Sequence, residues 1–174
     1  MNYSDVIYSL FKFVHDNVEV PNSLHVNYNN VLDEELLNGT IDEIVQVFFL
    51  NLSSAYQTTN PGTNVRFGIY TSVAKDPTRR RLYQLTDTVK NAIGSINNIP
   101  YYDFSNVTSA TDEPVDTGKT IPFVWMETIP VTLTSSVDYN IMYLDYRLFV
   151  SELCLELDED GRAAFGVGLE NKHG

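Results

Sequence analysis

Residues 44–52, IVQVFFLNL, and residues 65–71, VRFGIYT, decide the fold of this chain. Both runs are dense in β-branched and aromatic residues, which are enriched in strands because they pack well on a pleated surface. A polar segment, residues 53–64, separates them and holds the turn sequence Asn60-Pro61-Gly62, in which Pro presets φ and Gly accepts positive φ. The two runs are therefore predicted to pair as an antiparallel hairpin across a long loop.

Helical periodicity follows this hairpin and also precedes it. After the hairpin, Asp76-Pro77-Thr78 is predicted to open a helix, with Pro near the N-terminal end, where its missing N–H does no harm. The apolar residues of this helix recur at spacings of three and four: Leu82, Leu85, Val89, Ile93 and Ile96. Before the hairpin, residues 4–17 carry the same periodicity, and this helix is predicted to end before Pro21. The later helix should lie across the sheet with its apolar face down.

The chain then returns to extended segments. Residues 99–103 are predicted to be extended, and residues 105–120 to form a long loop without periodicity. A loop of this length in a compact domain is usually functional or mobile. Residues 121–133 resume strand character, but Pro122 and Pro130 predict that at least the ends of this strand are edges or bulges.

A last strand block closes the domain. Residues 139–157 alternate over a long run whose face shifts near Ser151, as a β-bulge or two successive strands would cause. Residues 159–174 are expected to be a flexible C-terminal tail. Because helices and strands do not alternate strictly, an α+β fold fits better than a doubly wound one. We expect a single domain over residues 1–158, with a mostly antiparallel or mixed sheet, an N-terminal helix and one central helix packed on the sheet.

Composition and charge limit the classes of function. The chain has 174 residues, within the range of one domain, and 43% of them are hydrophobic, so a full core is expected. The net charge is −12, and a surface of that sign repels phosphate, which argues against tight nucleic-acid binding. The one basic cluster, Arg79-Arg80-Arg81, is interpreted as a solvated helix start, with a contact to an anion or a partner as the alternative.

Motifs for catalysis are not found in the sequence. The single cysteine, Cys154, permits no internal disulfide, and its place in an apolar run is typical of a small buried hydrophobe. The histidines His15, His25 and His173 lack the spacing of a zinc site. Neither a phosphate-binding glycine loop nor a nucleophile elbow occurs.

Two acidic runs, residues 33–35 and 158–160, are the remaining candidates for chemistry. Calcium favours carboxylate ligands, but the spacing of an EF-hand loop is missing, and both runs are interpreted as solvated acidic turns. Neither a secretion signal nor an apolar run long enough to span a membrane occurs, so a soluble protein made in the cytoplasm is expected. The chain is predicted to have no catalytic residue, no metal site and no cofactor, and to be no enzyme.

The order of these elements resembles the tail terminator (tail completion) proteins of long-tailed bacteriophages. The resemblance covers residues 4–157 and rests on the leading helix, on the strand IVQVFFLNL and on the later segments VRFGIYTSVAKDP, RRRLYQLTDTVKNAI, IPYYDFSN and MYLDYRLFVSELCLEL. It implies a homo-oligomeric ring, typically of six subunits, that caps the tail tube protein, stops its polymerisation and offers a surface to a neck or head-completion protein. It also implies a place in the virion tail or neck after assembly in the host cytoplasm, with DNA passing through the ring without specific binding.

A closed ring uses two different patches on each subunit. The candidates for these contacts are the two polar loops, residues 53–64 and 105–120, which can order on meeting a neighbour. Within them we predict the following interaction residues: Tyr56, Asn60, Asn64, Asp112, Glu113, Asp116 and Lys119. The alternative for each loop is an ordinary flexible surface segment.

Three other functions remain open from the sequence. Another head–tail joint component, such as a neck, head-completion or tail-tube protein, would share the acidity and the self-association. A non-viral binding module would stay monomeric without its ligand. A metal-assisted hydrolase built on the carboxylates would be stabilised by calcium or magnesium, because a ligand stabilises the state that it binds.

Overall fold

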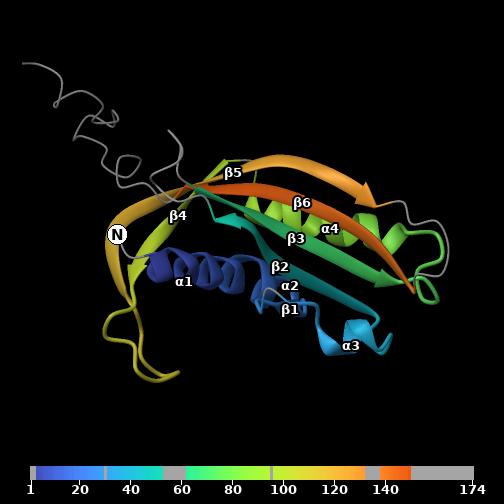
Figure 1. Cartoon of the computed structure of the whole chain (residues 1–174), viewed down its shortest axis with the longest axis horizontal. Helices are drawn as coiled ribbons and strands as arrows, with labels where there is room; N and C mark the ends of the chain where they lie inside the picture. The colour runs from blue at the N-terminus through green and yellow to red at the C-terminus, as the bar shows by residue number, and fades with distance from the viewer. Residues whose placement is uncertain (1–2, 30, 53–61, 95, 132–137, 150–174) are drawn as a thin grey trace, which may run out of the picture.

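The computed structural model describes residues 3–29, 31–52, 62–94, 96–131 and 138–149 (Figure 1). In this part of the chain, helices pack on one six-stranded mixed sheet, so the α+β prediction is confirmed. Across the sheet the strands follow the order β1 (Val26–Asn27), β2 (Glu43–Leu52), β3 (Gly62–Ser72), β6 (Tyr139–Phe149), β5 (Val115–Val131) and β4 (Ile96–Asp103). β1 lies parallel to β2, and every other neighbouring pair is antiparallel.

The predicted hairpin is formed by β2 and β3, with Val47 opposite Phe67. β3 begins at Gly62, so the prediction that the loop extends to residue 64 is wrong. Residues 62–64 belong to the strand because they pair with β6, a partner far along the chain. A Cβ atom on Gly62 would lie 2.7 Å from the carbonyl oxygen of Leu148, so the close approach of the two strands requires glycine here.

The N-terminal helix has three consecutive segments: α1 (Tyr3–Val14), the π-helical turn η1 (His15–Glu19) and α2 (Val20–Asn22). The predicted helix over residues 4–17 is confirmed, but its predicted end before Pro21 is wrong. Pro21 lies in α2, directly after the π-helical turn in which the N–H of Val20 bonds to the carbonyl of His15, so the continuous helix contains the proline beside a π-helical irregularity. The helix ends instead at Ser23, which adopts a left-handed conformation (φ 51°).

The central helix is α4 (Arg80–Ile93). Its predicted start and end are both corrected: Asp76-Pro77-Thr78 lies ahead of the helix, and Ile96 is the first residue of β4. Ile96 joins the sheet because it has a strand partner, Val124 of β5, and this pairing outweighs the helical periodicity. The rest of the apolar stripe is buried against the sheet as predicted: Leu82, Leu85, Val89 and Ile93.

β5 begins at Val115, so the last six residues of the loop predicted over residues 105–120 lie in a strand. That prediction is wrong because this segment carries no apolar periodicity: residues 115–120 are all exposed and are held by pairing with β4. Tyr101 lies opposite Lys119 and Tyr102 opposite Asp116, so Thr117 and Gly118 of β5 bulge out of the ladder, and Gly118 takes a positive φ (71°) that would strain a residue with a side chain.

The prolines predicted to mark edges or bulges lie on stretches of β5 that pair with a neighbouring strand on one side only. Pro122 pairs with β4 and Pro130 pairs with β6, and on the other side of each the described strands form no pair. β6 confirms the predicted last strand up to Phe149. The rest of that predicted strand, with the face shift near Ser151, and the tail over residues 159–174 lie outside the described residues.

One face of the sheet carries the main core. Helices α1 and α4 both contribute buried side chains to it, and these join the strands in a single cluster. Phe67, Phe123 and Tyr146 are fully buried at its centre, and their rings contact one another. Burying a side chain of this size contributes roughly 1.5–3 kcal/mol, so this helix-on-sheet layer stabilises the fold.

Two short elements, β1 and α3 (Glu34–Leu37), were not predicted from the sequence. α3 begins after Asp33, whose carboxylate accepts a hydrogen bond from the backbone N–H of Glu35 (2.9 Å). Helix capping therefore explains the acidic run over residues 33–35. On the other face of the sheet, α3 contributes to a second, smaller cluster of buried residues: Leu36, Ile44, Tyr70 and Tyr139.

Candidate assembly surfaces

The first candidate surface is the segment 103–120, here called the arm, which projects from the sheet near the start of α1 (Figure 1). It is a hairpin extension of β4 and β5, in which Asp103 lies opposite Val115 and Tyr102 lies opposite Asp116. Residues 115–120 of β5 are all exposed. This part of the arm therefore adds little to the core of its own subunit and presents its side chains to the outside.

Local hydrogen bonds give the arm a defined shape. The carboxylate of Asp112 accepts hydrogen bonds from the backbone N–H of Thr108 (2.8 Å), from its hydroxyl (2.9 Å) and from the N–H of Ser109 (2.8 Å). These bonds lower the pKa of Asp112 to about 2. At the base of the arm, Asp103 accepts a hydrogen bond from the N–H of Ser105 (2.8 Å), which holds its pKa below the usual value. Both carboxylates are ionised at neutral pH, and the arm is preorganised for binding.

The arm brings together four of the predicted interaction residues: Asp112, Glu113, Asp116 and Lys119. Asp116 and Lys119 lie in β5 and not in a loop, which corrects the prediction. Asn64 is not part of this group, because it lies in β3 and its Oδ1 accepts a hydrogen bond from Arg147 of β6 (3.2 Å). Tyr56 and Asn60 lie outside the described residues.

An open pocket of about 350 Å³ lies where the base of the arm meets α1. It is lined by Tyr8, Phe11, Lys12, His15, Asp16, Tyr28 and Phe104. Phe104 of the arm packs on Tyr8 with ring centroids 5.5 Å apart, and Phe11 packs on Tyr28 at 5.0 Å. The walls are therefore aromatic, and the pocket suits an apolar or aromatic side chain of a partner.

An ion pair and side-chain hydrogen bonds hold the polar groups at the rim of this pocket. Lys12 donates to Asp16 (2.9 Å), which raises the pKa of the Lys12 ammonium group. Glu19, one turn further along, pairs with His15 (2.9 Å) and accepts a hydrogen bond from the hydroxyl of Tyr28 (2.7 Å). Burial and this carboxylate raise the pKa of Tyr28 well above its usual value. Tyr28 therefore remains neutral at physiological pH.

The aromatic pocket was not predicted from the sequence. Its signal was an aromatic residue outside the buried stripe of α1: Tyr8 is 51% exposed, whereas Val6 and Leu10 are fully buried. Exposed apolar side chains that cluster indicate a contact surface. The other half of the pocket was not predictable, because Tyr28 and Phe104 come from segments that only the tertiary structure brings to α1.

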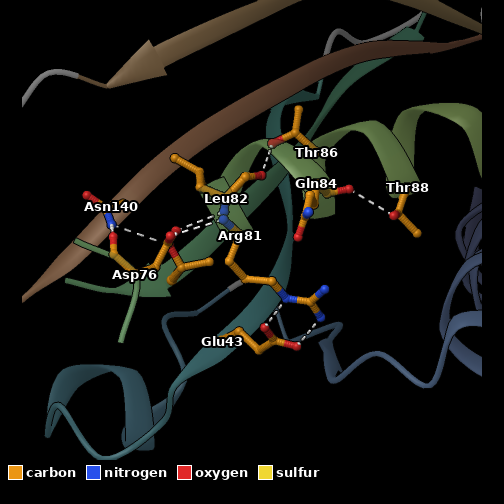
Figure 2. Close-up of polar contacts among 9 residues, drawn as sticks. Glu43, Asp76, Arg81, Leu82, Gln84, Thr86, Thr88 and Asn140 are labelled. Carbon is orange, nitrogen blue, oxygen red and sulfur yellow. Dashed lines mark hydrogen bonds and ion pairs between the residues drawn. The ribbon is translucent and has the colours of Figure 1, made fainter. Parts of the chain in front are cut away.

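The second candidate surface, here called the basic turn, is the turn between β3 and α4 together with the first residue of α4, and it carries Lys75, Arg79 and Arg80. None of these three forms an ion pair with another described residue. Arg81 differs, since it donates to both carboxylate oxygens of Glu43 at 2.6 and 2.7 Å (Figure 2). The cluster predicted as one helix start is therefore divided into a paired Arg81 and two cations that remain available.

Asp76 holds the basic turn in place (Figure 2). Its buried carboxylate accepts hydrogen bonds from the backbone N–H groups of Arg81 (3.0 Å) and Leu82 (2.9 Å) and from the hydroxyl of Thr71 (2.9 Å). Its backbone carbonyl accepts another from the side-chain amide of Asn140 (2.8 Å). Burial raises the pKa of Asp76, but the hydrogen bonds to its carboxylate outweigh burial and hold the pKa below its usual value. The turn is therefore tied to α4, β3 and β6 at once.

In the described part of the chain, no three His, Cys, Asp or Glu side chains are grouped so that they could hold a metal ion. None of the described helices is long and apolar enough to cross a membrane. A scan against models of known protein families gives no match to this chain, and neither does a search of curated protein sequences.

Proposed function

We propose that this chain is a structural protein of virion assembly, a ring-forming tail terminator that caps the tail tube, stops its polymerisation and offers a surface for neck or head attachment. The observation that carries the proposal is the arm. A hairpin whose residues 115–120 are exposed, and whose tip is ordered by its own hydrogen bonds, is typical of a segment that contacts another subunit. The resemblance of the element order to tail terminator proteins supports the same conclusion.

A ring also requires two different contact surfaces on each subunit. A contact between identical patches gives a two-fold dimer, whereas a contact between two different patches repeats around a ring when the rotation closes. The arm is one such patch, and it is acidic and projects from one side of the sheet. The rest of the surface offers patches of other kinds, including the basic turn and the aromatic pocket.

The acidity of the chain suits a ring through which DNA passes. A net charge of −12 gives the subunit an overall field that repels the phosphate backbone. A lumen with this sign of charge lets DNA slide without specific binding. The location in the virion tail or neck is part of the same proposal.

A binding module is the second candidate, and the aromatic pocket at the base of the arm favours it. Such a module would take an apolar or aromatic side chain of another protein between Tyr8, Phe11, Tyr28 and Phe104. It would stay monomeric without that partner, whereas a terminator associates with itself. Oligomeric state therefore discriminates between the two functions.

The first test is light scattering coupled to size exclusion, on the full chain over a range of protein and salt concentrations. We expect a discrete species near six times the monomer mass of 19.7 kDa, visible as single rings by electron microscopy. Long cylinders would indicate a tail-tube protein instead. A strict monomer at every concentration would contradict the proposal.

A variant with a shortened arm tests the observation that carries the proposal. Asp103 and Val115 are directly paired, so residues 104–114 can be replaced by Asn-Gly, a two-residue hairpin turn. We expect a folded monomer that no longer forms rings. The control is Phe104→Ala, which removes the contact with Tyr8 but keeps the arm, and it should still form rings. Rings that persist in the shortened variant would remove the arm from the proposal.

A further inference from the structure

The described cations are not distributed evenly. Several of them are engaged within the subunit, three in ion pairs and one over an aromatic ring: Lys12 with Asp16, Arg66 with Asp145, Arg81 with Glu43, and Lys90 over Trp125. Lys75, Arg79 and Arg80 have no such partner among the described residues and share one turn. A chain with a net charge of −12 therefore presents three available cations together at one place.

The arm carries the opposite charge. Four carboxylates and one lysine lie on it: Asp103, Asp112, Glu113, Asp116 and Lys119. Glu113 and Asp116 are exposed, and Oδ1 of Asp116 is held by the N–H of Gly118 (2.8 Å). Because the arm is already ordered, these carboxylates can engage a partner with little further loss of conformational entropy.

The two surfaces lie at opposite ends of the molecule. Figure 1 places the arm near the start of α1 at one end of the long axis, and the arrowhead of β3, which leads into the basic turn, near the other end. The arm therefore does not reach the basic turn of its own subunit, but it can reach that of another copy. Contact between unlike patches at opposite ends is the head-to-tail geometry that builds a ring.

We infer that the arm of one copy docks on the basic turn of the next copy, with Glu113 and Asp116 facing Arg79 and Arg80. The inference rests on the proposed function, because it names the second surface of the ring contact. Hydrogen bonds between guanidinium and carboxylate groups are short and directional. Complementary charges of this kind set the orientation and register of an interface and speed the encounter of the partners.

Three carboxylates, those of Asp76, Asp42 and Asp138, lie at the same end of the sheet as the basic turn, and none forms an ion pair with its cations. The carboxylate of Asp76 is buried and accepts hydrogen bonds from two N–H groups at the start of α4. It already serves as the anion at this helix start, so a partner would contact the side chains of the cations instead. Asp42 and Asp138 are exposed, and their backbone carbonyls accept hydrogen bonds from the N–H groups of Ser72 (2.7 Å) and Val73 (2.8 Å) at the end of β3. The basic turn leads into α4, whose apolar stripe packs on the main core.

The backbone at Arg79 points to the same role. Arg79 has φ 60° and ψ 15°, a left-handed conformation that favours glycine over residues with side chains. Backbone strain of this kind is found at functional sites more than elsewhere. An arginine at this position keeps a cation on the surface of the turn, which a glycine would not supply.

The test is a charge exchange in the full chain, followed by sedimentation velocity at low and high salt. One variant carries Arg79→Glu with Arg80→Glu, and the other carries Glu113→Lys with Asp116→Lys. Each variant alone brings like charges together, and we expect its association to weaken by roughly tenfold or more. An equimolar mixture of the two should assemble again, because every contact then joins opposite charges. Association of the wild type should also weaken with salt, which screens exposed charges.

The control variant is Glu34→Lys with Glu127→Lys, which reverses two exposed carboxylates outside both surfaces and should associate like the wild type. Arm and turn variants that associate normally, or a mixture that stays dissociated, would overturn the docking while wild-type rings still supported the proposed function. A wild-type chain that never associates would overturn both.

Discussion

The arm and the turn that holds Asp76 are both polar segments between regular elements, yet they are stabilised in different ways. In the arm, Asp112 accepts hydrogen bonds from Thr108 and Ser109, three and four residues away. At the turn, the carboxylate of Asp76 binds the start of α4, and Asn140 reaches its carbonyl from 64 residues further along the chain. The arm can therefore take its shape locally, whereas the turn needs three assembled elements. Removal of the Asp76 carboxylate should therefore destabilise the fold, and changes in the arm should alter its contacts.

Asp76→Ala should give the largest effect on stability. It removes a buried anion and leaves two backbone N–H groups and the hydroxyl of Thr71 without their acceptor. The loss of charged hydrogen bonds and of a helix cap predicts a decrease of about 2–4 kcal/mol in the free energy of unfolding. Urea unfolding followed by circular dichroism measures this decrease. Asp76→Asn keeps one acceptor oxygen and should lose less, and a loss below about 1 kcal/mol for the alanine variant would contradict the importance of the network.

The pH dependence of stability sharpens the same point. The pKa of Asp76 is lower in the folded state than its ordinary value of 3.8, so its stabilisation is fully present above that value and is lost as the pH falls through the folded-state pKa. The advantage of the wild type over Asp76→Asn should therefore shrink in acid. Urea midpoints of both proteins from about pH 2 to pH 7 measure it. An advantage that stays constant over this range would show that the charge of Asp76 does not contribute.

Arg79→Gly should have smaller effects: it should raise the folding stability and weaken assembly. Glycine adopts the left-handed backbone of Arg79 without strain but loses more entropy on folding, so we expect a net gain of roughly 0.5 kcal/mol in folding stability. The loss of one cation should weaken association. Thermal unfolding and sedimentation velocity on the same preparations measure the two effects. Arg79→Lys keeps both the charge and the strain and should change neither by much.

Asp112→Ala should have the smallest effect on global stability, because its hydrogen bonds are local and exposed. We expect an unchanged unfolding midpoint and faster amide hydrogen exchange at Thr108 and Ser109, whose N–H groups lose their acceptor. Hydrogen exchange read by mass spectrometry or NMR measures this local opening. A large drop in the unfolding midpoint would show that the arm is coupled to the core and would remove the contrast with Asp76.

The elements with strong periodicity were predictable from the sequence. The run IVQVFFLNL forms the expected strand, and the stripe from Leu82 to Ile93 lies on the expected helix. Both were predictable because an element that buries one side repeats its apolar residues with a regular spacing, and a short stretch of sequence is enough to show that spacing. The errors lie at element ends. Residues 62–64 and 115–120 are polar, and they become strand because β6 and β4 supply partners from elsewhere in the chain.

The candidate surfaces were predictable in part. The sequence marks the polar segment that contains Asp112 and Glu113, but the strand that carries Asp116 and Lys119 depends on pairing with β4. It marks three adjacent arginines, but the pairing of Arg81 with Glu43 depends on α4 packing beside β2. The aromatic pocket joins segments far apart in the chain, and no local pattern encodes it.

By itself the sequence determined the α+β class, the hairpin, the central helix and the acidic character of the chain, because composition and periodicity are properties of short segments. Only the tertiary structure decided that Asp76 is buried, that Arg79 and Arg80 remain available, and that the arm and the basic turn lie at opposite ends of the molecule. These properties depend on contacts between distant residues, and burial sets the free energy of each such polar contact.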